Sequence, residues 1–198
     1  FHKTIDDEIF RYGQMDTIDG EQVLVTQPRN VDRPVRLRGA ELGAIKELGP
    51  LLPALDGLSV SANVTFLDVE YPVVLGDGTR TTLDVLPQQP RQLWNLTLNY
   101  ARGPLRTTLA WSRTGELWDD RFPNYSSLPE FYRNRYQQPL DRIDLKLGWD
   151  VSPAVSLSLD VLNLAGQGYQ YRIGRDQEYV QSAWKMAPTV MVGVNVKL

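Results

Sequence analysis

The sequence predicts an all-β fold, an antiparallel meander of about nine long amphipathic strands of the type that forms a transmembrane β-barrel. Residues 140–164 give the clearest evidence, because apolar side chains alternate with charged or small polar ones through two strands joined at residues 152–154. Such alternation places the apolar side chains on one face of a sheet. Several strands run to about ten residues, longer than the roughly six typical of globular sheets. The connections between strands alternate between short and long, as in outer-membrane barrels.

Composition excludes several classes of function. The 198 residues carry a formal net charge of -3 and no cysteine. The charge gives no basic patch, so nucleic acid is not an expected partner, and the lack of cysteine excludes a disulfide framework and thiolate metal sites. No apolar run reaches the roughly 18 residues of a membrane-spanning helix, but a β-barrel escapes that test because only alternate residues contact lipid. The chain starts at Phe1 without a signal peptide, so we expect it to be a piece of a longer protein.

The N-terminal part of the chain alternates least clearly. Residues 1–12 are expected to form a strand, although charged residues interrupt its apolar positions. Residues 15–21 contain two aspartates and a glycine and are expected to form a turn. A short β-branched strand is expected over residues 22–27, before Pro28.

Residues 35–48 are expected to form a strand whose apolar positions change parity at Gly39. A change of parity predicts a β-bulge, and glycine tolerates the backbone angles that a bulge requires. The alternative for this segment is a short amphipathic helix over residues 40–48. Residues 49–57 contain two prolines and are expected to form a turn.

The rest of the chain alternates regularly. Strands are expected at residues 58–66, 94–100, 105–111, 140–151, 155–164 and 190–198. Their tight turns lie at residues 101–104 and 152–154, and their long loops at residues 68–90, 115–139 and 166–187. Gly76, Asp77 and Gly78 are expected to form a hairpin tip in the first long loop. Short turns therefore lie at one edge of the predicted sheet and long loops at the other.

Aromatic residues bound the apolar stripes of these strands. Tyr100 and Trp149 lie near the tight turns, whereas Phe66, Trp94 and Trp111 lie near the long loops. Outer-membrane barrels carry such aromatic girdles around a lipid-facing band. A soluble β-sandwich also alternates apolar and polar residues, but the strand lengths, the loop asymmetry and the charged second face favour the barrel. Bacterial single-chain barrels have even strand numbers, so about nine strands are not expected to close a barrel alone.

Several segments, in this order, resemble the carboxy-terminal part of a TonB-dependent outer-membrane receptor. They are FHKTIDD at residues 1–7, RGAEL at residues 38–42, LSVSANVTFLD at residues 58–68, PRQLWNLTLNY at residues 90–100, residues 140–149 and VLNL at residues 161–164. The resemblance implies a 22-stranded barrel, of which residues 1–198 would supply about the last nine strands. The plug domain and the TonB-contacting segment of that family are absent from this sequence.

The resemblance implies a function and a set of partners. The function is active uptake of a scarce solute, such as a ferric siderophore, a vitamin or an oligosaccharide, with energy from the TonB complex. The implied partners are outer-membrane lipid and lipopolysaccharide, the plug and the remaining barrel strands, in a Gram-negative outer membrane. No enzyme activity and no cofactor are expected. The alternatives are a passive porin or structural outer-membrane barrel, and a soluble β-sandwich that binds carbohydrate.

No catalytic arrangement is visible in the sequence. His2 is the only histidine, which excludes a histidine-based triad and a multi-histidine metal site. The acidic runs at residues 6–8 and 119–120 have the oxygen ligands of a hard cation, but a solvated surface explains such runs more often. Four asparagines alternate with the apolar residues and are expected to face the barrel lumen: Asn63, Asn95, Asn99 and Asn195.

Aromatic and arginine residues crowd two of the long loops, at residues 115–139 and 166–187. Aromatic planes stack on sugars and on the rings of siderophores, and arginine binds carboxylates or phosphates through two hydrogen bonds. Solute contacts are therefore expected from Arg121, Tyr125, Tyr132, Arg133, Arg135, Tyr169, Tyr171, Arg172, Tyr179 and Trp184. The alternative is that these residues lie at the lipopolysaccharide interface, where aromatic and basic groups are also favoured.

Overall fold

The computed structural model describes residues 1–74, 79–119, 135–173, 177 and 179–197, with the backbone alone for residues 11–15, 24 and 26. The described residues form fifteen β-strands and one short 3-10 helix, η1 (Pro53–Leu55). The strands are β1 (His2–Ile5), β2 (Ile9–Ile18), β3 (Glu21–Asn30), β4 (Val35–Glu47), β5 (Leu58–Val74), β6 (Arg80–Leu83), β7 (Gln92–Arg102), β8 (Leu105–Thr114), β9 (Leu117–Trp118), β10 (Arg135–Gln137), β11 (Leu140–Ser152), β12 (Val155–Leu162), β13 (Gln170–Ile173), β14 (Tyr179–Ala183) and β15 (Thr189–Val196).

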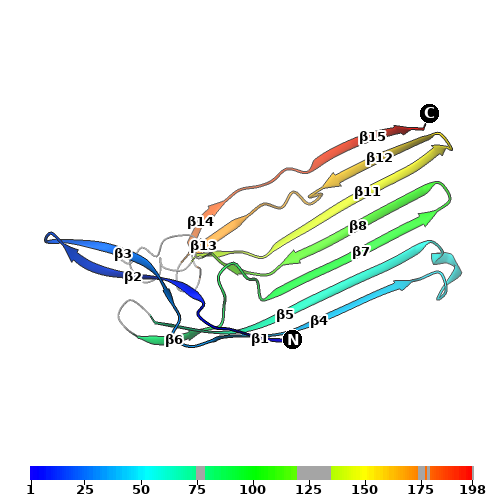
Figure 1. Cartoon of the computed structure of the whole chain (residues 1–198). Coiled ribbons are helices and arrows are strands. Elements are labelled where there is room, and N and C mark those ends of the chain that lie inside the picture. The colour runs from blue at the N-terminus through cyan, green and yellow to red at the C-terminus, as the bar shows by residue number, and fades with distance from the viewer. Residues whose placement is uncertain (75–78, 120–134, 174–176, 178, 198) are drawn as a thin grey trace.

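One open antiparallel sheet dominates the molecule (Figure 1). It has nine strands in the order β1-β4-β5-β7-β8-β11-β12-β15, with β6 paired to the far end of β5. The predicted antiparallel meander is thus confirmed, and the two edge strands, β1 and β15, do not pair with each other. The strands lie in one continuous sheet, not in the two stacked sheets of a sandwich. Among the described residues no helix is long and apolar enough to span a membrane.

The two faces of this sheet differ in polarity, and the strand register continues each face from β4 to β15. One row of paired residues runs Lys46, Val60, Leu98, Leu109, Leu145, Val161 and Val190. A neighbouring row runs Leu58, Tyr100, Thr107, Leu147, Leu159 and Val192. We call this apolar side the outer face and the opposite side the inner face. Phe66 and Trp94 also lie on the outer face, with ring centroids 5.5 Å apart.

Polar side chains cover much of the inner face and bond to one another across strands. The Asn95 amide donates a hydrogen bond to the Asn63 side chain (2.8 Å), and Thr108 Oγ1 donates one to Asn99 (2.9 Å). Arg106 and Asp150 form an ion pair of 2.6 Å between β8 and β11. The asparagines therefore occupy the face on which the sequence predicts them.

Four short strands continue the sheet beyond the ends of β8, β11, β12 and β15. They form a separate four-stranded sheet in the order β14-β13-β10-β9, which repeats the order of the longer strands that they adjoin. Two segments expected to be loops, residues 115–139 and 166–187, therefore contain strands. The expected loop at residues 68–90 is also partly strand, because β5 extends to Val74 and pairs with β6. The expected hairpin tip at residues 76–78 lies outside the described residues.

The bulge expected at Gly39 and the alternative helix are both wrong. The pairing of β4 with β5 runs without a shift from Arg36 and Glu70 to Glu47 and Ser59. The apolar residues change parity because Val35 and Leu37 lie on the inner face in a buried core, whereas Ala40 and Leu42 lie on the outer face. Gly39 has another role, since the Phe1 ring occupies the space that a β-carbon at this position would take.

The N-terminal segment forms a hairpin that leaves the main sheet (Figure 1). The expected single strand at residues 1–12 is broken at residues 6–8, and Asp7 has a positive φ of 56°. The expected turn at residues 15–21 is shorter, because β2 pairs with β3 up to Ile18 and Glu21. Asp19 and Gly20 make this turn with φ angles of 53° and 87°, as an Asp-Gly hairpin turn requires.

The buried core lies on the inner face at one end of the main sheet. There the start of β4 and the end of β5 are covered by other segments. It consists of Val35, Leu37, Val69, Tyr71, Val73 and Trp118. Partly buried apolar residues from the hairpin, from the segment after β6 and from β10 surround it, including Phe10, Val85 and Tyr136. We call the end of the sheet that carries this core and the four-stranded sheet the upper end.

Candidate functional site

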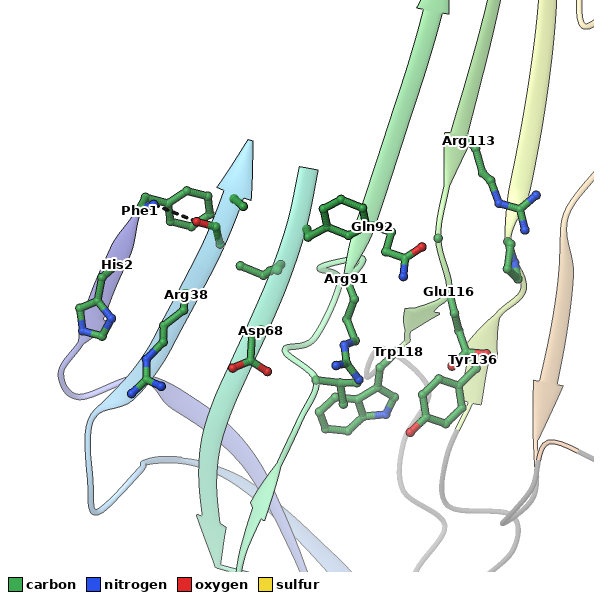
Figure 2. Close-up of a pocket in the computed structure, with 17 residues that line it drawn as sticks. Phe1, His2, Arg38, Asp68, Arg91, Gln92, Arg113, Glu116, Trp118 and Tyr136 are labelled. Carbon is green, nitrogen blue, oxygen red and sulfur yellow. Dashed lines mark hydrogen bonds between the residues drawn. The ribbon is translucent and has the colours of Figure 1, made fainter. Parts of the chain in front are cut away.

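A pocket of about 920 Å³ lies beside the core at the upper end of the sheet (Figure 2). Gly39, Leu67 and Arg91 line its base, and the Leu67 N–H donates to the Arg91 carbonyl (2.8 Å), which sets the two residues side by side. Gly39 and Leu67 are paired on the inner face. The Phe1 ring closes the β1 side of the pocket above Gly39.

Aromatic residues form the opposite wall of the pocket. Trp118 of β9 and Tyr136 of β10 are paired across their strands, and both contact the buried core. Because that core covers the inner face of β4 and β5, Trp118 and Tyr136 must point to the inner side of the four-stranded sheet. Figure 2 shows both rings near Arg91, with Phe1 and His2 farther along the pocket.

Charged groups give this pocket a mixed polarity. Arg91 Nη1 and Asp84 Oδ2 form an ion pair of 2.8 Å, with both side chains largely exposed, and Glu116 lines the pocket near Tyr136. Burial raises the pKa of the Tyr136 hydroxyl above its usual value, and the carboxylates of Glu116 and Asp84 raise it further. Tyr136 therefore stays neutral and can donate a hydrogen bond. The pocket offers flat apolar surfaces together with a guanidinium and carboxylates, which suits an aromatic or ring-shaped polar solute.

Four residues expected to bind solute lie together on the other side of the four-stranded sheet. Arg135 precedes Tyr136 in β10 and so points away from the pocket. Its guanidinium lies 4.0 Å from the centre of the Tyr171 ring, and the Tyr171 hydroxyl donates to Gln137 Oε1 (3.0 Å). Trp184 lies 5.6 Å from Tyr171 and 6.2 Å from Tyr169, measured between ring centroids. The structure therefore brings Arg135, Tyr169, Tyr171 and Trp184 together, on the side opposite the pocket.

The other six expected residues are placed differently. Arg121, Tyr125, Tyr132 and Arg133 lie outside the described residues. Arg172 pairs with Tyr136 and so shares the inner side, where its Nη1 donates to the Gln177 carbonyl (3.2 Å). Tyr179 begins the edge strand β14, opposite Ile173, and is about half exposed. Solute binding by these ten residues stays a prediction.

A buried ion pair lies beside the group formed by Arg135, Tyr169, Tyr171 and Trp184, which we call the outer cluster. Asp119 is 3% exposed, its Oδ2 lies 3.6 Å from Arg135 Nε, and its Oδ1 accepts a hydrogen bond from Gln88 (3.0 Å). This aspartate is therefore not the solvated residue that an acidic run usually indicates. No group of three or more potential metal ligands lies together in the part of the chain that the structure describes.

Asn163 ties the segment after β12 to the main sheet. It is 6% exposed and has a φ of 55°, a conformation that asparagine adopts more readily than most residues. Its Nδ2 donates to the carbonyls of Gln167 (2.9 Å) and Met186 (3.0 Å), and its N–H donates to Asp144 Oδ1 (2.7 Å). Asn163 thereby holds both ends of residues 167–186 at the upper end of β12.

Sequence reasoning missed the residues that line the pocket, above all Arg91, Glu116, Trp118 and Tyr136. One available signal was the parity of β11, whose even positions Arg142 and Asp144 carry the charge of the inner face. Extending that parity back to residue 136 places Tyr136 on the inner side and Arg135 on the outer side. No comparable signal marked Arg91, because its place depends on the pairing of residues far apart in sequence.

Comparisons with known proteins agree with this architecture. The family model described as TonB dependent receptor-like, beta-barrel matches residues 1–164. Among solved structures, the unliganded ferric citrate transporter FecA matches with a TM-score of 0.58 and 20% identity over 82% of this chain and 24% of FecA. The siderophore receptor PiuA from Acinetobacter baumannii matches at 0.58 and 18%, over 98% of this chain and 25% of PiuA.

A further structural match is FpvA of P. aeruginosa bound to an iron-loaded pyoverdine, with a TM-score of 0.61 and 15% identity. It covers 98% of this chain and 24% of FpvA, so the chain spans about a quarter of the receptors that it matches. At these identities the solved structures show the fold alone. The comparison with curated proteins found no match.

The open sheet, its apolar outer face and its polar inner face define part of the wall of a membrane β-barrel. The family match over residues 1–164 then shows that the chain belongs to the TonB-dependent receptor-like β-barrel family. Members of this family are transport receptors of Gram-negative outer membranes, so the expectation that the chain is not an enzyme is confirmed at the level of the family.

Proposed function

We propose that residues 1–198 form the carboxy-terminal part of the barrel of a TonB-dependent receptor that stands in the outer membrane. The receptor takes up a scarce solute, such as a ferric siderophore, a vitamin or an oligosaccharide, with energy from TonB. The rest of the barrel would pair with the free edges of the sheet, at β15 and along the lower part of β4. The plug would contact the polar inner face.

The height of the apolar band supports a position across the membrane. On β11 the outer-face positions between Asp141 and Ser152 are all apolar: Ile143, Leu145, Leu147, Trp149 and Val151. At about 3.3 Å per residue and a tilt of about 40°, these roughly ten residues rise about 25 Å. This height equals the apolar band of outer-membrane barrels, which is also about 25 Å.

The pocket beside Trp118 and Tyr136 supports the proposal that the solute binds on the inner side of the sheet, at its upper end. It is the place where aromatic planes, Arg91 and Glu116 border one cavity of about 920 Å³. It adjoins the short strands rather than the tight turns, so in a receptor barrel it would open toward the cell exterior. A solute could therefore reach it without crossing the apolar band.

The test compares uptake in cells that carry the full-length gene, lack it, or lack TonB. Radioiron-loaded siderophores, labelled cobalamin and labelled oligosaccharides are the probes. We expect uptake of one class to need both the gene and TonB. Uptake that needs the gene but not TonB would identify a passive porin instead and would overturn the proposal of active transport.

A further inference from the structure

We propose that Gln88 is a positioning residue that fixes the width of the pocket, that is, the separation between Arg91 and the aromatic wall of Trp118 and Tyr136. Gln88 does so by tying a short segment, residues 84–91, to the end of β9. We call this segment the strap. The inference rests on the proposed function, because the pocket is the site proposed for the solute. Gln88 does not line the pocket itself, so it acts through Arg91, which does.

The pocket lies where the main sheet divides. The pairing of β5 with β7 stops at Phe66 and Gln92. Beyond this level β5 pairs only with β4 and β6, and β9 pairs only with β10, in the part of the chain that the structure describes. Figure 2 shows Arg91 on one side of this division and the Trp118 and Tyr136 rings on the other. Strand pairing therefore does not set the distance between the two sides of the pocket.

The strap crosses this division and is anchored to β5 at both of its ends. Leu83, which directly precedes the strap, pairs with Tyr71 of β5. At the other end the Arg91 carbonyl accepts a hydrogen bond from the Leu67 N–H (2.8 Å). The ion pair of Arg91 Nη1 with Asp84 Oδ2 (2.8 Å) joins the two ends. The strap is therefore a closed loop that carries Arg91 at its base.

Gln88 ties the apex of the strap to β9 through two hydrogen bonds. Its backbone N–H donates to the Trp118 carbonyl (3.0 Å), and its side-chain amide donates to Asp119 Oδ1 (3.0 Å). Asp119 is 3% exposed, and its own N–H donates to the Arg135 carbonyl of β10 (2.9 Å). The acceptor thus belongs to the four-stranded sheet, whereas Gln88 is an exposed residue of the strap. These two bonds connect the two sides of the pocket.

The backbone of Gln88 indicates that its side chain has a specific role. The Gln89 N–H donates to the Leu86 carbonyl (3.2 Å), and Pro87 takes the second position of the resulting β-turn. Gln88 takes the third position with a φ of 60°, as a type II turn requires, and glycine or asparagine usually supplies this conformation. A glutamine is strained there, whereas a glycine is not. The hydrogen bond to Asp119 accounts for a residue that the turn itself disfavours.

The alternative is that apolar packing alone sets the width of the pocket. Trp118 is 7% exposed and belongs to the buried core, and Val85 and Leu86 of the strap pack against the same core. Apolar packing is not directional, whereas hydrogen bonds fix a distance and an angle between the groups that they join. The two explanations therefore differ in the effect of removing one exposed side-chain amide.

The first measurement follows the width of the pocket in the full-length receptor with no cysteine other than the labelled ones. Gln88→Ala removes the amide and keeps the backbone N–H, and the matched control is Gln89→Ala, at the neighbouring exposed glutamine of the same turn. Spin labels at Thr82 in β6 and at Ala183 in β14, both exposed, report the distance between the two sides by double electron–electron resonance. We expect a broader distance distribution in Gln88→Ala and the wild-type distribution in the control.

The second measurement follows uptake by cells that carry the full-length gene. The probes are radioiron-loaded siderophores, labelled cobalamin and labelled oligosaccharides, and the half-saturating concentration is measured for the probe that the wild type takes up. We expect Gln88→Ala to raise this concentration about fivefold, within the range for residues that act through others, with the maximal rate per folded receptor unchanged. In an Arg91→Ala background Gln88→Ala should have no further effect, because it acts through Arg91.

An unchanged distance distribution in Gln88→Ala would overturn the proposal, as would an equal loss of affinity with and without Arg91. Gln88→Gly lacks the same amide but suits the turn, so it should widen the distribution as Gln88→Ala does. A wild-type distribution in Gln88→Gly would assign the effect of alanine to backbone strain and also overturn the proposal. Uptake of none of the probes by the wild type would contradict the transport function, whereas the spin-label distances would still decide the role of Gln88.

Discussion

Arg135 and Tyr136 are neighbours in β10, yet they belong to two different regions of the molecule. Tyr136 borders the pocket on the inner side, beside the exposed pair of Arg91 and Asp84. Arg135 points to the outer side, stacks on Tyr171 and faces the buried Asp119. Both regions are rich in aromatic residues and arginine, so composition does not distinguish them. The two regions differ in burial. The charges of Arg135 and Asp119 are buried and face each other, whereas those of Arg91 and Asp84 are exposed to solvent.

The largest expected effect comes from Asp119→Asn in the outer cluster. This change removes the carboxylate that faces the Arg135 guanidinium, whose side chain is only 14% exposed, so we expect unfolding of the full-length receptor to become easier by about 3–5 kcal/mol. Denaturant unfolding followed by gel mobility measures the change. The matched control is Asp84→Asn, which pairs with Arg91 of the pocket, where the carboxylate is 74% exposed and the expected cost is about 0–1 kcal/mol. Equal costs at the two sites would remove the distinction between the regions.

The next effect concerns the attachment of the upper segment to the sheet. Asn163→Ala removes two partly buried hydrogen bonds to backbone carbonyls and places alanine at a φ of 55°, so we expect a loss of about 2–3 kcal/mol. Limited proteolysis should then cut residues 166–187 faster while the barrel stays folded. The control is Asn63→Ala, which removes one exposed side-chain hydrogen bond and should leave the cutting rate unchanged. An unchanged rate for Asn163→Ala would mean that other contacts hold the segment.

A third comparison is functional and uses binding of the transported solute once uptake has identified it. Arg91→Ala should weaken binding about tenfold, or about 1.4 kcal/mol, because a charged hydrogen bond to the solute is lost. Trp184→Ala in the outer cluster should leave the affinity within about twofold. Isothermal titration with the full-length receptor measures both. A larger effect from Trp184 than from Arg91 would place the solute on the outer cluster, as sequence reasoning expected.

The smallest effect is a dependence on pH that belongs to Tyr136, which lies above the apolar band. Its pKa is raised from 10.0 in the folded chain, so the neutral hydroxyl is favoured by folding. This contribution is complete below pH 10 and is lost as pH rises through the higher folded value. We expect the free energy of unfolding to fall more steeply above pH 10 in the wild type than in Tyr136→Phe. Parallel curves would show that burial of Tyr136 does not affect its ionisation.

The sequence predicted the wall of the sheet well because each wall strand meets different surroundings on its two faces. Residues 140–164 are the clearest case, since the outer positions must be apolar along the whole length. The hairpin β2–β3 was predicted less well. It leaves the main sheet, so its two faces do not meet lipid and barrel interior, and its sequence does not alternate regularly between apolar and polar residues. The strands β9, β10, β13 and β14 have only 2, 3, 4 and 5 residues, too few to show alternation.

The pocket was harder to predict than the wall for a physical reason. Phe1, Leu67 and Trp118 are far apart in sequence, and only the pairing of β1 with β4 and the folding of β9 over the core bring them to one cavity. Extending the alternation of β11 back across residues 138–139 could have placed Tyr136 and Arg135 on opposite faces of the sheet. Gly39 shows a different kind of error. The apolar residues of β4 move from the inner face to the outer face at this position, and the sequence pattern was interpreted as a bulge in the backbone.

The proposed position in a barrel requires one face of the sheet to meet lipid and the other face to meet the barrel interior. Residues 1–198 contain no cysteine that would compete with single cysteine-attached labels at Leu145 and Lys146, which are neighbours on β11, and at their partners Val161 and Asp160. Spin-label accessibility in the full-length receptor in bilayers is the direct measurement. Labels at Leu145 and Val161 should be reached by oxygen, and labels at Lys146 and Asp160 by a water-soluble nickel complex. The same preference at all four positions would show that the two faces of the sheet do not meet different surroundings.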